Sequence, residues 1–475
     1  MVYCLVLISM DEAISDKCAI VVAHTLHDVY GFMKDLQHRG REAAGIAAIG
    51  DTIDVLKWIG PVSYFDLEDL HKIFPGSAYH TFLGHLRYAT KGRKEHLLQD
   101  AHPHAIGGEF LERGDHLLIR DCQAVIVHNG QVNVPDLEGI VTEKLTTDCD
   151  SEALLHYYML KGERQMMQNI TGAYTLAIAD TRKKDVIVMR DRTGIKPGVL
   201  GFKDGRCGVA SEDVAFRKNG GKVIENLQPG AIYYLGHNGE YTKEVIIKEK
   251  LRQCFFEWNY ITDAETVLNR VPVKDMREIL GETLAEEFHP DDADIVTFLP
   301  RCPEAAARAY ARTTSIPFLP VFYKVRAERS FMGSTETERK DSINFNLHLL
   351  PGYESRLRDK TIVLMDDSTI RGNNCTRARD VLLQAGVQKI YHLNYTPPIG
   401  IIGADGIARG CEFGVDMPPT DTFIARGRTR EEISAILKME VHYISAEGML
   451  RSFEKAGIAR SSLCTYCIGG NHPFR

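Results

Sequence analysis

Two adjacent carboxylates follow an apolar run in the second half of the sequence. The run Thr361-Ile-Val-Leu-Met365 ends at Asp366-Asp367, and a polar loop then continues through Gly372 into a predicted helix. At the carboxyl end of a buried parallel strand, such carboxylates can take two ribose hydroxyls, directly or through Mg²⁺. Backbone N–H groups of the loop and of the helix N-terminus can hold a phosphate. The segment therefore predicts a site for a phosphorylated ribose, and the alternative is an ordinary loop cap.

Polar residues in four segments of the first half form a second candidate group. Each has a purely structural interpretation, because Asn129-Gly130 after the apolar strand 124–127 is typical of a tight turn, Asp150 of a helix N-cap and Arg87 of an ion pair. Their combination favours one shared site. The segments are Leu36-Gln-His-Arg-Gly-Arg-Glu-Ala-Ala-Gly45, Gly84-His-Leu-Arg-Tyr-Ala-Thr-Lys-Gly92, His128-Asn-Gly130 and Asp150-Ser-Glu-Ala-Leu-Leu-His156.

The elements that must position these residues differ between the two halves. To about residue 250, β-branched residues and glycine-rich turns predict antiparallel strands, with helices at about 26–38 and 151–168. Examples of the strands are 175–180, 186–190 and 231–235.

The second half alternates strands with helices, which implies a parallel sheet with right-handed crossovers. Gly386 is placed to close the last predicted helix. The predicted strands are 295–299, 361–365 and 390–395, and the predicted helices lie at about 304–314 and 374–385.

Composition limits the class of protein. A chain of 475 residues is longer than one core usually organises, so we expect two domains. A formal net charge of -7 argues against a nucleic-acid platform. No apolar run approaches the length of a membrane span, and the apolar start lacks a basic region, so we expect a cytoplasmic protein without a membrane partner. The odd total of 11 cysteines makes disulfides improbable.

The four segments of the first half resemble the class II glutamine amidotransferases, the N-terminal-nucleophile type, over about residues 18–240. The resemblance implies that Asn129 and the N–H of Gly130 hold the oxyanion. It also implies that Arg87 binds the carboxylate of glutamine and Asp150 its ammonium group. Further matching segments are Asp100-Ala-His-Pro-His104, Asp191-Arg-Thr-Gly-Ile-Lys-Pro197 and Ala210-Ser-Glu212.

In this family the nucleophile is an N-terminal cysteine whose own α-amino group is the base. Cys18-Ala-Ile-Val-Val22 resembles the family's start, with Ala19 in place of the usual glycine and a slightly short interval to Leu36. We therefore expect Cys18 as the nucleophile and 1–17 as a cleaved leader, because an amide nitrogen cannot act as a base. Cys4 lies too far from Leu36. A structural cysteine at the start of a buried strand is the alternative for Cys18.

The Asp366-Asp367 segment resembles the phosphoribosyl pyrophosphate motif of the type I phosphoribosyltransferases. Its closest form, Asp-Asp-Ser-Ile-Val-Arg-Gly-Thr-Thr, belongs to the amidophosphoribosyltransferase family. Lys324-Val-Arg-Ala-Glu-Arg-Ser-Phe331 resembles that family's catalytic loop, whereas Pro300-Arg-Cys-Pro-Glu-Ala305 departs from its Pro-Asp-Ser-Gly-Arg-Pro. The residues expected to bind phosphoribosyl pyrophosphate are Asp366, Asp367, Ser368, Arg371, Gly372, Asn373, Asn374, Lys324 and Arg326, with Asp366 and Asp367 also expected to bind Mg²⁺.

Four cysteines match ligand positions in the iron–sulfur branch of the same family, and the resemblance implies a structural 4Fe–4S cluster. A Cys₄ zinc site is the alternative. Cys122, Cys149, Cys207 and Cys375 lie in no recognisable cysteine motif. The matching segments are Cys254-Phe-Phe-Glu-Trp258, Cys411-Glu-Phe-Gly-Val-Asp-Met-Pro418 and Cys464-Thr-Tyr-Cys467.

Together the resemblances imply an α+β glutamine amidotransferase domain at 18–250, with antiparallel sheets in four layers. An α/β phosphoribosyltransferase domain with a parallel sheet and a cysteine tail would follow at 251–475. Ammonia from glutamine would react with phosphoribosyl pyrophosphate in the first step of purine synthesis, in a tetramer inhibited by purine nucleotides. The alternatives are a divergent phosphoribosyl pyrophosphate- or nucleotide-binding regulator and an amidotransferase with different phosphoribosyl acceptor chemistry.

Overall fold

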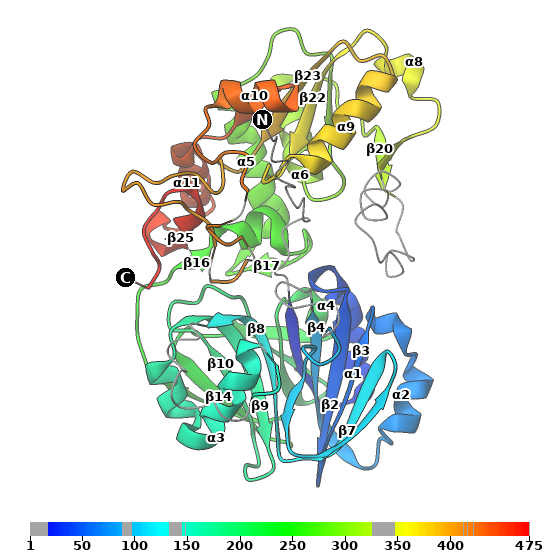
Figure 1. The fold of residues 1–475 in the computed structure, drawn as a ribbon, viewed down its shortest axis with the longest axis vertical. Coiled ribbons are helices and arrows are strands. Elements are labelled where there is room, and N and C mark those ends of the chain that lie inside the picture. Colours follow the sequence, from blue (N-terminus) through cyan, green and yellow to red (C-terminus); the bar gives the residue numbers. More distant parts are fainter. Residues whose placement is uncertain are drawn as a thin grey trace, which may run out of the picture.

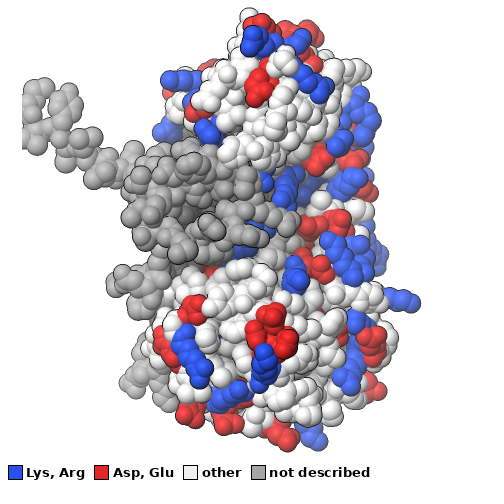
Figure 2. All heavy atoms as spheres, turned by 90° about the vertical axis from the view of Figure 1, so that its right-hand side faces the viewer, with Lys and Arg blue, Asp and Glu red and all other residues white. Residues whose placement is uncertain are grey.

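The computed structural model describes residues 18–87, 97–132, 145–147, 149–324, 347–411, 413–415, 417–420 and 422–474. The two halves of the chain lie one above the other, with the N-terminal half at the bottom of Figure 1 and the C-terminal half at the top. On the face drawn in Figure 2, Lys and Arg are interspersed with Asp and Glu among the described residues. None of the helices in this part of the chain has the length and apolar character required to cross a membrane.

A nine-stranded antiparallel sheet forms one layer of the N-terminal half. Its central strand pairs set the register, for example Ala19 opposite Leu86 and Ala43 opposite Arg87. In sheet order the strands are β13 (Lys222–Asn226), β11 (Val199–Lys203), β12 (Arg206–Ala210), β1 (Ala19–Ala23), β4 (Tyr79–Arg87), β2 (Ala43–Gly50), β3 (Ile53–Ile59), β7 (His116–Cys122) and β6 (Glu109–Arg113).

A six-stranded antiparallel sheet packs on the first one. Residues at alternating positions fill the space between them: Ile20 and Val22 come from β1, and Val125 and Val127 from β8. This alternation is what a strand with one face in the core requires. In sheet order the strands are β15 (Tyr241–Val245), β14 (Ala231–Leu235), β10 (Val186–Arg190), β9 (Gly172–Asp180), β8 (Ala124–Val132) and β5 (His104–Ile106).

Helices cover the outer faces of both sheets. Helices α1 (Leu26–Asp35), α2 (Leu67–Ile73) and α4 (Val214–Lys218) share a core with the outward residues of the nine-stranded sheet. Helix α3 (Asp150–Asn169) does the same for the six-stranded sheet. The predicted four-layer α+β architecture with antiparallel sheets is therefore confirmed.

The C-terminal half is built on a parallel sheet, as predicted. Apolar residues at alternating positions of its strands face two separate cores, one on each side. The strands in order are β19 (Ile295–Phe298), β22 (Thr361–Asp366), β23 (Lys389–Asn394) and β24 (Glu440–Tyr443). Helices α5 (Val273–Glu287), α6 (Glu304–Thr314) and α11 (Ala446–Lys455) cover one face, and α9 (Asn373–Gln384) and α10 (Arg430–Leu437) cover the other.

Short elements complete the described structure. A π-helix, η5 (Glu257–Ile261), lies in the segment that connects the antiparallel sheets to α5. The others are η1 (Gln37–Arg39), η2 (Val62–Tyr64), β16 (Gln253–Cys254), β17 (Val267–Leu268), β18 (Val271–Pro272), β20 (Phe322–Lys324), β21 (Leu347–Leu349), α8 (Glu354–Leu357), η7 (Arg460–Ser462), β25 (Leu463–Cys464) and η8 (Tyr466–Ile468).

Several local predictions are confirmed, and three need correction. Strands 186–190 and 231–235 and helix 304–314 have the predicted bounds. The predicted tight turn at 128–130 is wrong, because β8 continues through it to Val132 and pairs with β9. The predicted helix 26–38 ends at Asp35 and gives way to η1. The predicted loop over 36–45 is only partly a loop, since β2 begins at Ala43.

Candidate active sites

Cys18 immediately precedes β1, an interior strand of the nine-stranded sheet. Ala19 pairs with Leu86 in an antiparallel ladder, and the next residues along the two chains are Cys18 and Arg87, the last residue of β4. The guanidinium Nε of Arg39 donates a hydrogen bond to the Cys18 carbonyl oxygen over 3.1 Å. The sheet thus brings the predicted nucleophile and the predicted carboxylate clamp to the same edge.

Asn129 and Gly130 lie in the extended strand β8, on the facing sheet. Asn129 is 1% exposed, and neither its amide nitrogen nor its amide oxygen has a hydrogen-bond partner among the described residues. A buried amide without partners costs free energy, which is recovered when a ligand pairs with it. At Gly130, φ is +152°, and a Cβ would lie 1.9 Å from the Ala173 carbonyl oxygen, so no side chain fits.

Asp150 opens helix α3, as predicted, with Cys149 at the N-cap position. Its Oδ2 accepts the backbone N–H of Val132 over 2.9 Å, which ties the helix start to the end of β8. The Ser151 hydroxyl donates to Asp150 Oδ1 over 3.3 Å and lies 2.8 Å from His128 Nδ1. The carboxylate is therefore held at the N-terminus of α3, against the end of β8, the strand that also carries Asn129.

A group of buried imidazoles lies between the sheets, beside Arg87. His85 stacks on His102 with 4.0 Å between ring centroids, and His102 meets His104 edge-on at 4.6 Å. His85 Nε2 lies 2.9 Å from the His128 carbonyl oxygen, which links β4 to β8. Burial lowers the pKa of His85 to about 3 and those of His102 and His104 well below the usual value, so these rings are neutral near pH 7.

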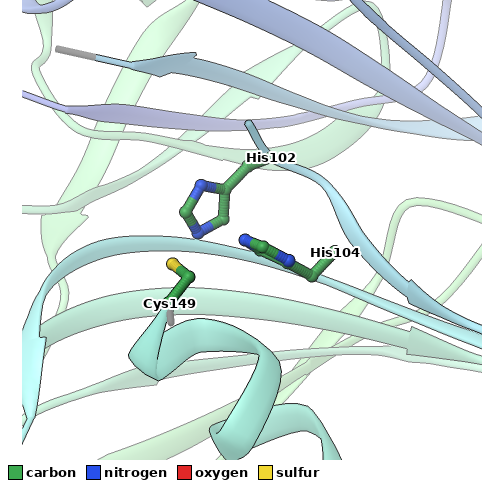
Figure 3. Close-up of side chains that lie close together, drawn as sticks. All are labelled: His102, His104 and Cys149. Atoms are coloured by element: carbon green, nitrogen blue, oxygen red, sulfur yellow. The ribbon is translucent and has the colours of Figure 1, made fainter. Parts of the chain in front are cut away.

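Cys149 joins two of these histidines in one compact group. Figure 3 shows its sulfur, at the start of α3, pointing toward the rings of His102 and His104. The ligand atoms of the three residues all lie within 4.8 Å of one another. The sequence interpretation placed Cys149 in no motif, because its partners come from a distant segment. The only available signal was a His-Pro-His segment in a chain with an unpaired cysteine near a predicted helix start.

The phosphoribosyl segment has the predicted strand–loop–helix form. Asp366 ends β22, and Asp367 follows with its backbone N–H donating to Asp366 Oδ1 over 2.9 Å. The Ser368 hydroxyl donates to Asp367 Oδ2 over 2.8 Å. Both carboxylates are buried, and burial, followed by the charge of Asp367, raises the pKa of Asp366 well above its usual value. A cation or two ribose hydroxyls would relieve this crowding of negative charge.

The loop closes at Gly372, the N-cap of α9. Its φ is +89°, and a Cβ there would lie 2.7 Å from Leu437 Cδ2, so both backbone conformation and space require glycine. Asn373 and Asn374 form the first turn of α9, with partly exposed and exposed side chains, respectively. Arg371 precedes them in the same loop. The structure thus brings the predicted loop residues together at the N-terminus of the helix, where backbone N–H groups are available for a phosphate.

Lys324 ends β20, and its ammonium group interacts electrostatically with the carboxylates of Asp366 and Asp367. The charges that act on its ammonium group are those of Asp366, Asp367, Arg301 and Arg41. Arg301 belongs to the loop whose sequence departs from the family, and Arg41 comes from the N-terminal half. Arg326, the other predicted residue of this loop, falls outside the described part of the chain.

The four cysteines predicted to hold a cluster come together at the lower end of the C-terminal half. Cys254 in β16 pairs directly with Cys464 in the parallel strand β25. Burial, followed by the neighbouring thiols Cys411 and Cys464, raises the pKa of Cys254 well above its usual value. Burial and the other three thiols raise the pKa of Cys467 in the same way. All four are partly buried free thiols, and three of them pack against an apolar cluster formed by Ala173, Ile195 and Phe413. The arrangement suits a group that binds several thiolates.

One functional connection was missed by sequence reasoning. Arg39, fully buried, donates through Nη1 to Glu212 and to Glu257, and through Nη2 to Glu257. Burial alone would raise the pKa of Glu212, but the charges of His38 and Arg39 lower it below the usual range. Glu257 lies in the cysteine segment of the second half, so no sequence spacing could pair it with Arg39.

Known proteins resemble this chain over nearly its full length. A family model described as a glutamine amidotransferase domain matches residues 112–253. The amidophosphoribosyltransferase of Methanothermobacter thermautotrophicus is 29% identical, covering 98% of this chain and 96% of that protein. That of Archaeoglobus fulgidus is 28% identical, covering 94% of each, and that of Bacillus subtilis is 27% identical, covering 94% and 90%.

Two solved structures share the fold. One is glutamine phosphoribosylpyrophosphate amidotransferase from B. subtilis in complex with ADP and GMP, with a TM-score of 0.79 and 24% identity over 96% of this chain and 97% of that chain. The other is described as the allosteric regulatory enzyme of purine biosynthesis, with a TM-score of 0.77 and 23% identity over 96% of each chain. Both support the predicted order of an amidotransferase fold followed by a phosphoribosyltransferase fold.

Proposed function

We infer that this chain, a member of the amidophosphoribosyltransferase family, transfers ammonia from glutamine to phosphoribosyl pyrophosphate. The products are 5-phosphoribosylamine, glutamate and pyrophosphate, in the first step of purine synthesis. The observation that carries this conclusion is the placement of two different sites in one chain. Cys18 and Asn129 belong to the antiparallel sheets, and Asp366 and Asp367 belong to the parallel sheet.

Two interactions between the halves support a connection between the proposed sites. Arg39 connects the Cys18 carbonyl oxygen to Glu257 of the second half. Two residues later in the chain, Arg41 acts electrostatically on Lys324, which also lies near Asp366. A short path at this junction would let ammonia pass from one site to the other without protonation by bulk water.

In the glutamine site, we propose that Cys18 attacks the side-chain amide after removal of residues 1–17 frees its α-amino group as the base. Arg87 and Asp150 would hold the carboxylate and ammonium groups of glutamine. Asn129 and the N–H of Gly130 would stabilise the oxyanion, and loss of one such donor typically costs about 2.7–4 kcal/mol of barrier. The unpartnered Asn129 amide supports this role, because a substrate oxygen would supply its missing hydrogen bond.

In the phosphoribosyl site, Asp366 and Asp367 would bind the ribose hydroxyls, and Ser368 to Asn374 the 5-phosphate at the start of α9. Mg²⁺, when bound to the pyrophosphate group, would neutralise its charge and improve it as a leaving group. Lys324 and Arg326 would approach the pyrophosphate as cations. Since the two carboxylates are buried side by side, and the charge of Asp367 adds to burial in raising the pKa of Asp366, a cation at this place fits the chain.

A second candidate function comes from the loop Pro300-Arg301-Cys302-Pro303-Glu304, whose sequence departs from that of the family. Arg301 stands where the family has an aspartate, and Cys302 stands where it has a serine. The Sγ of Cys302 lies 3.3 Å from the Asn259 carbonyl oxygen. A loop altered in this way suits slower transfer, a different phosphoribosyl acceptor, or a regulator that binds phosphoribosyl pyrophosphate without transfer.

For the cysteine group, we propose a 4Fe–4S cluster bound by Cys254, Cys411, Cys464 and Cys467. The cluster would tie the C-terminal tail to the body of the protein, and it would take no part in either half-reaction. The packing of Cys254, Cys411 and Cys464 against one apolar cluster supports this proposal. A zinc ion bound by the same four residues is the alternative, and iron and zinc analysis separates the two.

The remaining proposals concern the organisation of the protein. We place the domain boundary between residues 250 and 251, ahead of the cysteine segment that begins at Gln253. A homotetramer, inhibition by purine nucleotides and a cytoplasmic location would follow the pattern of the family. None of them changes the assignment of the two half-sites.

Release of pyrophosphate is the direct test of the proposed function. Purified protein with glutamine, phosphoribosyl pyrophosphate and Mg²⁺ should release glutamate and pyrophosphate in equal amounts. Binding of phosphoribosyl pyrophosphate without pyrophosphate release, with either glutamine or ammonia as nitrogen donor, would instead establish the regulator.

A further inference from the structure

The buried group formed by His102, His104 and Cys149 has the composition of a metal site. His102 lies just before β5, His104 begins it, and Cys149 caps α3, so three side chains from two segments converge (Figure 3). Their ligand atoms lie within 4.8 Å of one another. We propose that these three residues bind a Zn²⁺ ion in the N-terminal half, separate from the four-cysteine group.

The buried imidazole nitrogens of His102 and His104 support a metal ion at this place. His102 is 5% exposed and His104 is 4% exposed. Among the described residues, both ring nitrogens of His102 and the Nε2 of His104 lack a hydrogen-bond partner. Buried polar atoms without partners cost free energy, and two adjacent rings with three such atoms are not explained by packing alone. A metal ion accepts one lone pair from each ring and removes most of this cost.

His104 is already oriented as a metal ligand. Its ring hydrogen-bonds to the backbone carbonyl of Asp100, and since Nε2 has no partner, the donating nitrogen is Nδ1. A hydrogen bond of this kind fixes the tautomer with the lone pair on Nε2, and it is the usual outer support of histidine ligands. The Nε2 lone pair is therefore directed into the group that contains Cys149.

The ligand set favours zinc among common metals. One thiolate and two imidazoles form a mixed sulfur and nitrogen set that suits Zn²⁺, whereas Mg²⁺ and Ca²⁺ require oxygen ligands. Zinc bonds of about 2.0–2.3 Å in tetrahedral geometry place the donor atoms about 3.4–3.6 Å apart. From the 4.8 Å limit, the donors need to approach one another by at most about 1.2–1.4 Å, which side-chain rotation can supply. Three protein ligands leave one position for water or a substrate group.

The charges around the group are close to balanced. The cations are Lys57, whose Nζ donates to the carbonyl oxygens of Gln99 and Ala101, and Arg87. The carboxylates that act on Lys57 or Cys149 are Asp100, Glu152 and Asp150. Zn²⁺ with one thiolate adds a single positive charge, and these acids offset it. The surroundings therefore accept the ion without a large electrostatic penalty.

The position of the ion suggests its role, and this part rests on the proposed function. Cys149 immediately precedes Asp150, the proposed clamp for the ammonium group of glutamine, and the two histidines follow Asp100, whose carboxylate lies 3.6 Å from Arg87. Zinc would hold Cys149, and with it the start of α3, at a fixed distance from His102 and His104 at the start of β5. Cys149 is then a positioning residue for glutamine binding.

Metal content tests the site independently of activity. Protein exposed to excess Zn²⁺ and then desalted should hold about one zinc fewer per chain in Cys149→Ser than in the wild type, with His102→Gln giving the same loss. Cys122→Ser removes another buried thiol of the same half and should change nothing. With Co²⁺ as probe, the thiolate-to-cobalt absorption that depends on Cys149 should disappear in Cys149→Ser. Equal zinc content and equal cobalt spectra in wild type and Cys149→Ser would overturn the proposal.

X-ray absorption of zinc-loaded wild-type protein requires no substitution, so it decides the matter even where a variant does not fold. A bound zinc with nitrogen and sulfur neighbours supports the site, and zinc with sulfur neighbours alone contradicts it. For the role, Cys149→Ser should raise the KM for glutamine several-fold and leave ammonia-dependent synthesis unchanged. Zinc loss with an unchanged KM would refute the positioning role only, whereas a wild type inactive with both nitrogen donors would refute the proposed function.

Discussion

Arg39 and Glu257 form a buried salt bridge that joins the two halves of the chain. The bonds Nη1 to Oε2 and Nη2 to Oε1 both measure 3.1 Å, which is the parallel geometry of a guanidinium with a carboxylate. The same guanidinium donates to the carbonyl oxygen of Cys18. Arg39 therefore connects Glu257 of the second half to the backbone of the proposed nucleophile.

The first prediction follows from this bridge. Glu257→Gln should weaken the connection but leave Arg39 paired with Glu212, so the protein folds, with a loss of stability below the about 3–5 kcal/mol typical of a broken buried pair. Ammonia should then escape, and more glutamate than pyrophosphate should form. Measurement of both products checks this. The control Lys72→Ala breaks only exposed ion pairs and should keep the ratio of glutamate to pyrophosphate at one. An unchanged ratio in Glu257→Gln would show that the bridge does not couple the sites.

The second prediction separates the half-reactions. Cys18→Ala should abolish glutamine hydrolysis and retain ammonia-dependent synthesis, because the acceptor site lies on the parallel sheet. Asp367→Ala should do the opposite and retain basal glutaminase activity. Glutamate and pyrophosphate assays with each nitrogen donor check both variants. Loss of both activities in both folded variants would argue against two independent sites.

The third prediction concerns Asn129. Asn129→Ala should lower kcat for glutamine hydrolysis by about 10²–10³-fold, which is the usual effect of one lost oxyanion donor. Because the Asn129 amide has no partner among the described residues, the thermal midpoint should fall little. Asn259→Ala is the matched control, since its amide donates to the Thr396 hydroxyl over 2.9 Å and its loss should destabilise the protein more. A large drop in stability for Asn129→Ala would assign Asn129 to folding instead.

The fourth prediction is a pH dependence of stability. Burial lowers the pKa of His392 to about 4, and its Nε2 lies 2.8 Å from the Thr369 hydroxyl. The folded state therefore binds fewer protons than the unfolded state between about pH 6.5 and pH 4. Stability from this group is complete above the unfolded pKa and falls by about 3 kcal/mol in total as the pH drops through that window. His392→Gln should remove this part of the acid sensitivity in urea unfolding measured near pH 7 and near pH 5, and identical pH slopes in both proteins would contradict it.

The fifth prediction concerns the four cysteines. Cys254→Ser should lower the iron content and the stability together, because one ligand of a shared cluster is lost from the β16–β25 pair. Protein purified without oxygen should be brown. Cys207→Ser, a buried thiol in the other half, should leave iron unchanged. About one zinc and no iron per chain would favour the Cys₄ zinc site.

Local sequence determined the elements and the most compact motif. The run Thr361–Met365 with the two aspartates predicted a strand, a loop and a helix, because apolar patterning and glycine placement act over a few residues. The change from antiparallel to parallel sheets was also visible, since β-hairpins and strand–helix alternation have different patterns. The extended conformation of Asn129-Gly130 was not predicted, because pairing with Thr175 and Tyr174 of β9 overrides the turn preference of that dipeptide.

The tertiary structure decided which distant residues meet. Arg39 finds Glu257, and Cys149 finds His102, across intervals that no local pattern encodes. Sequence resemblance pointed to Cys254 and Cys464 as partners, but their pairing depends on two short strands at opposite ends of the second half. Such contacts form only when whole sheets pack, because burial of the apolar faces, and not the polar residues themselves, provides most of the free energy that brings them together.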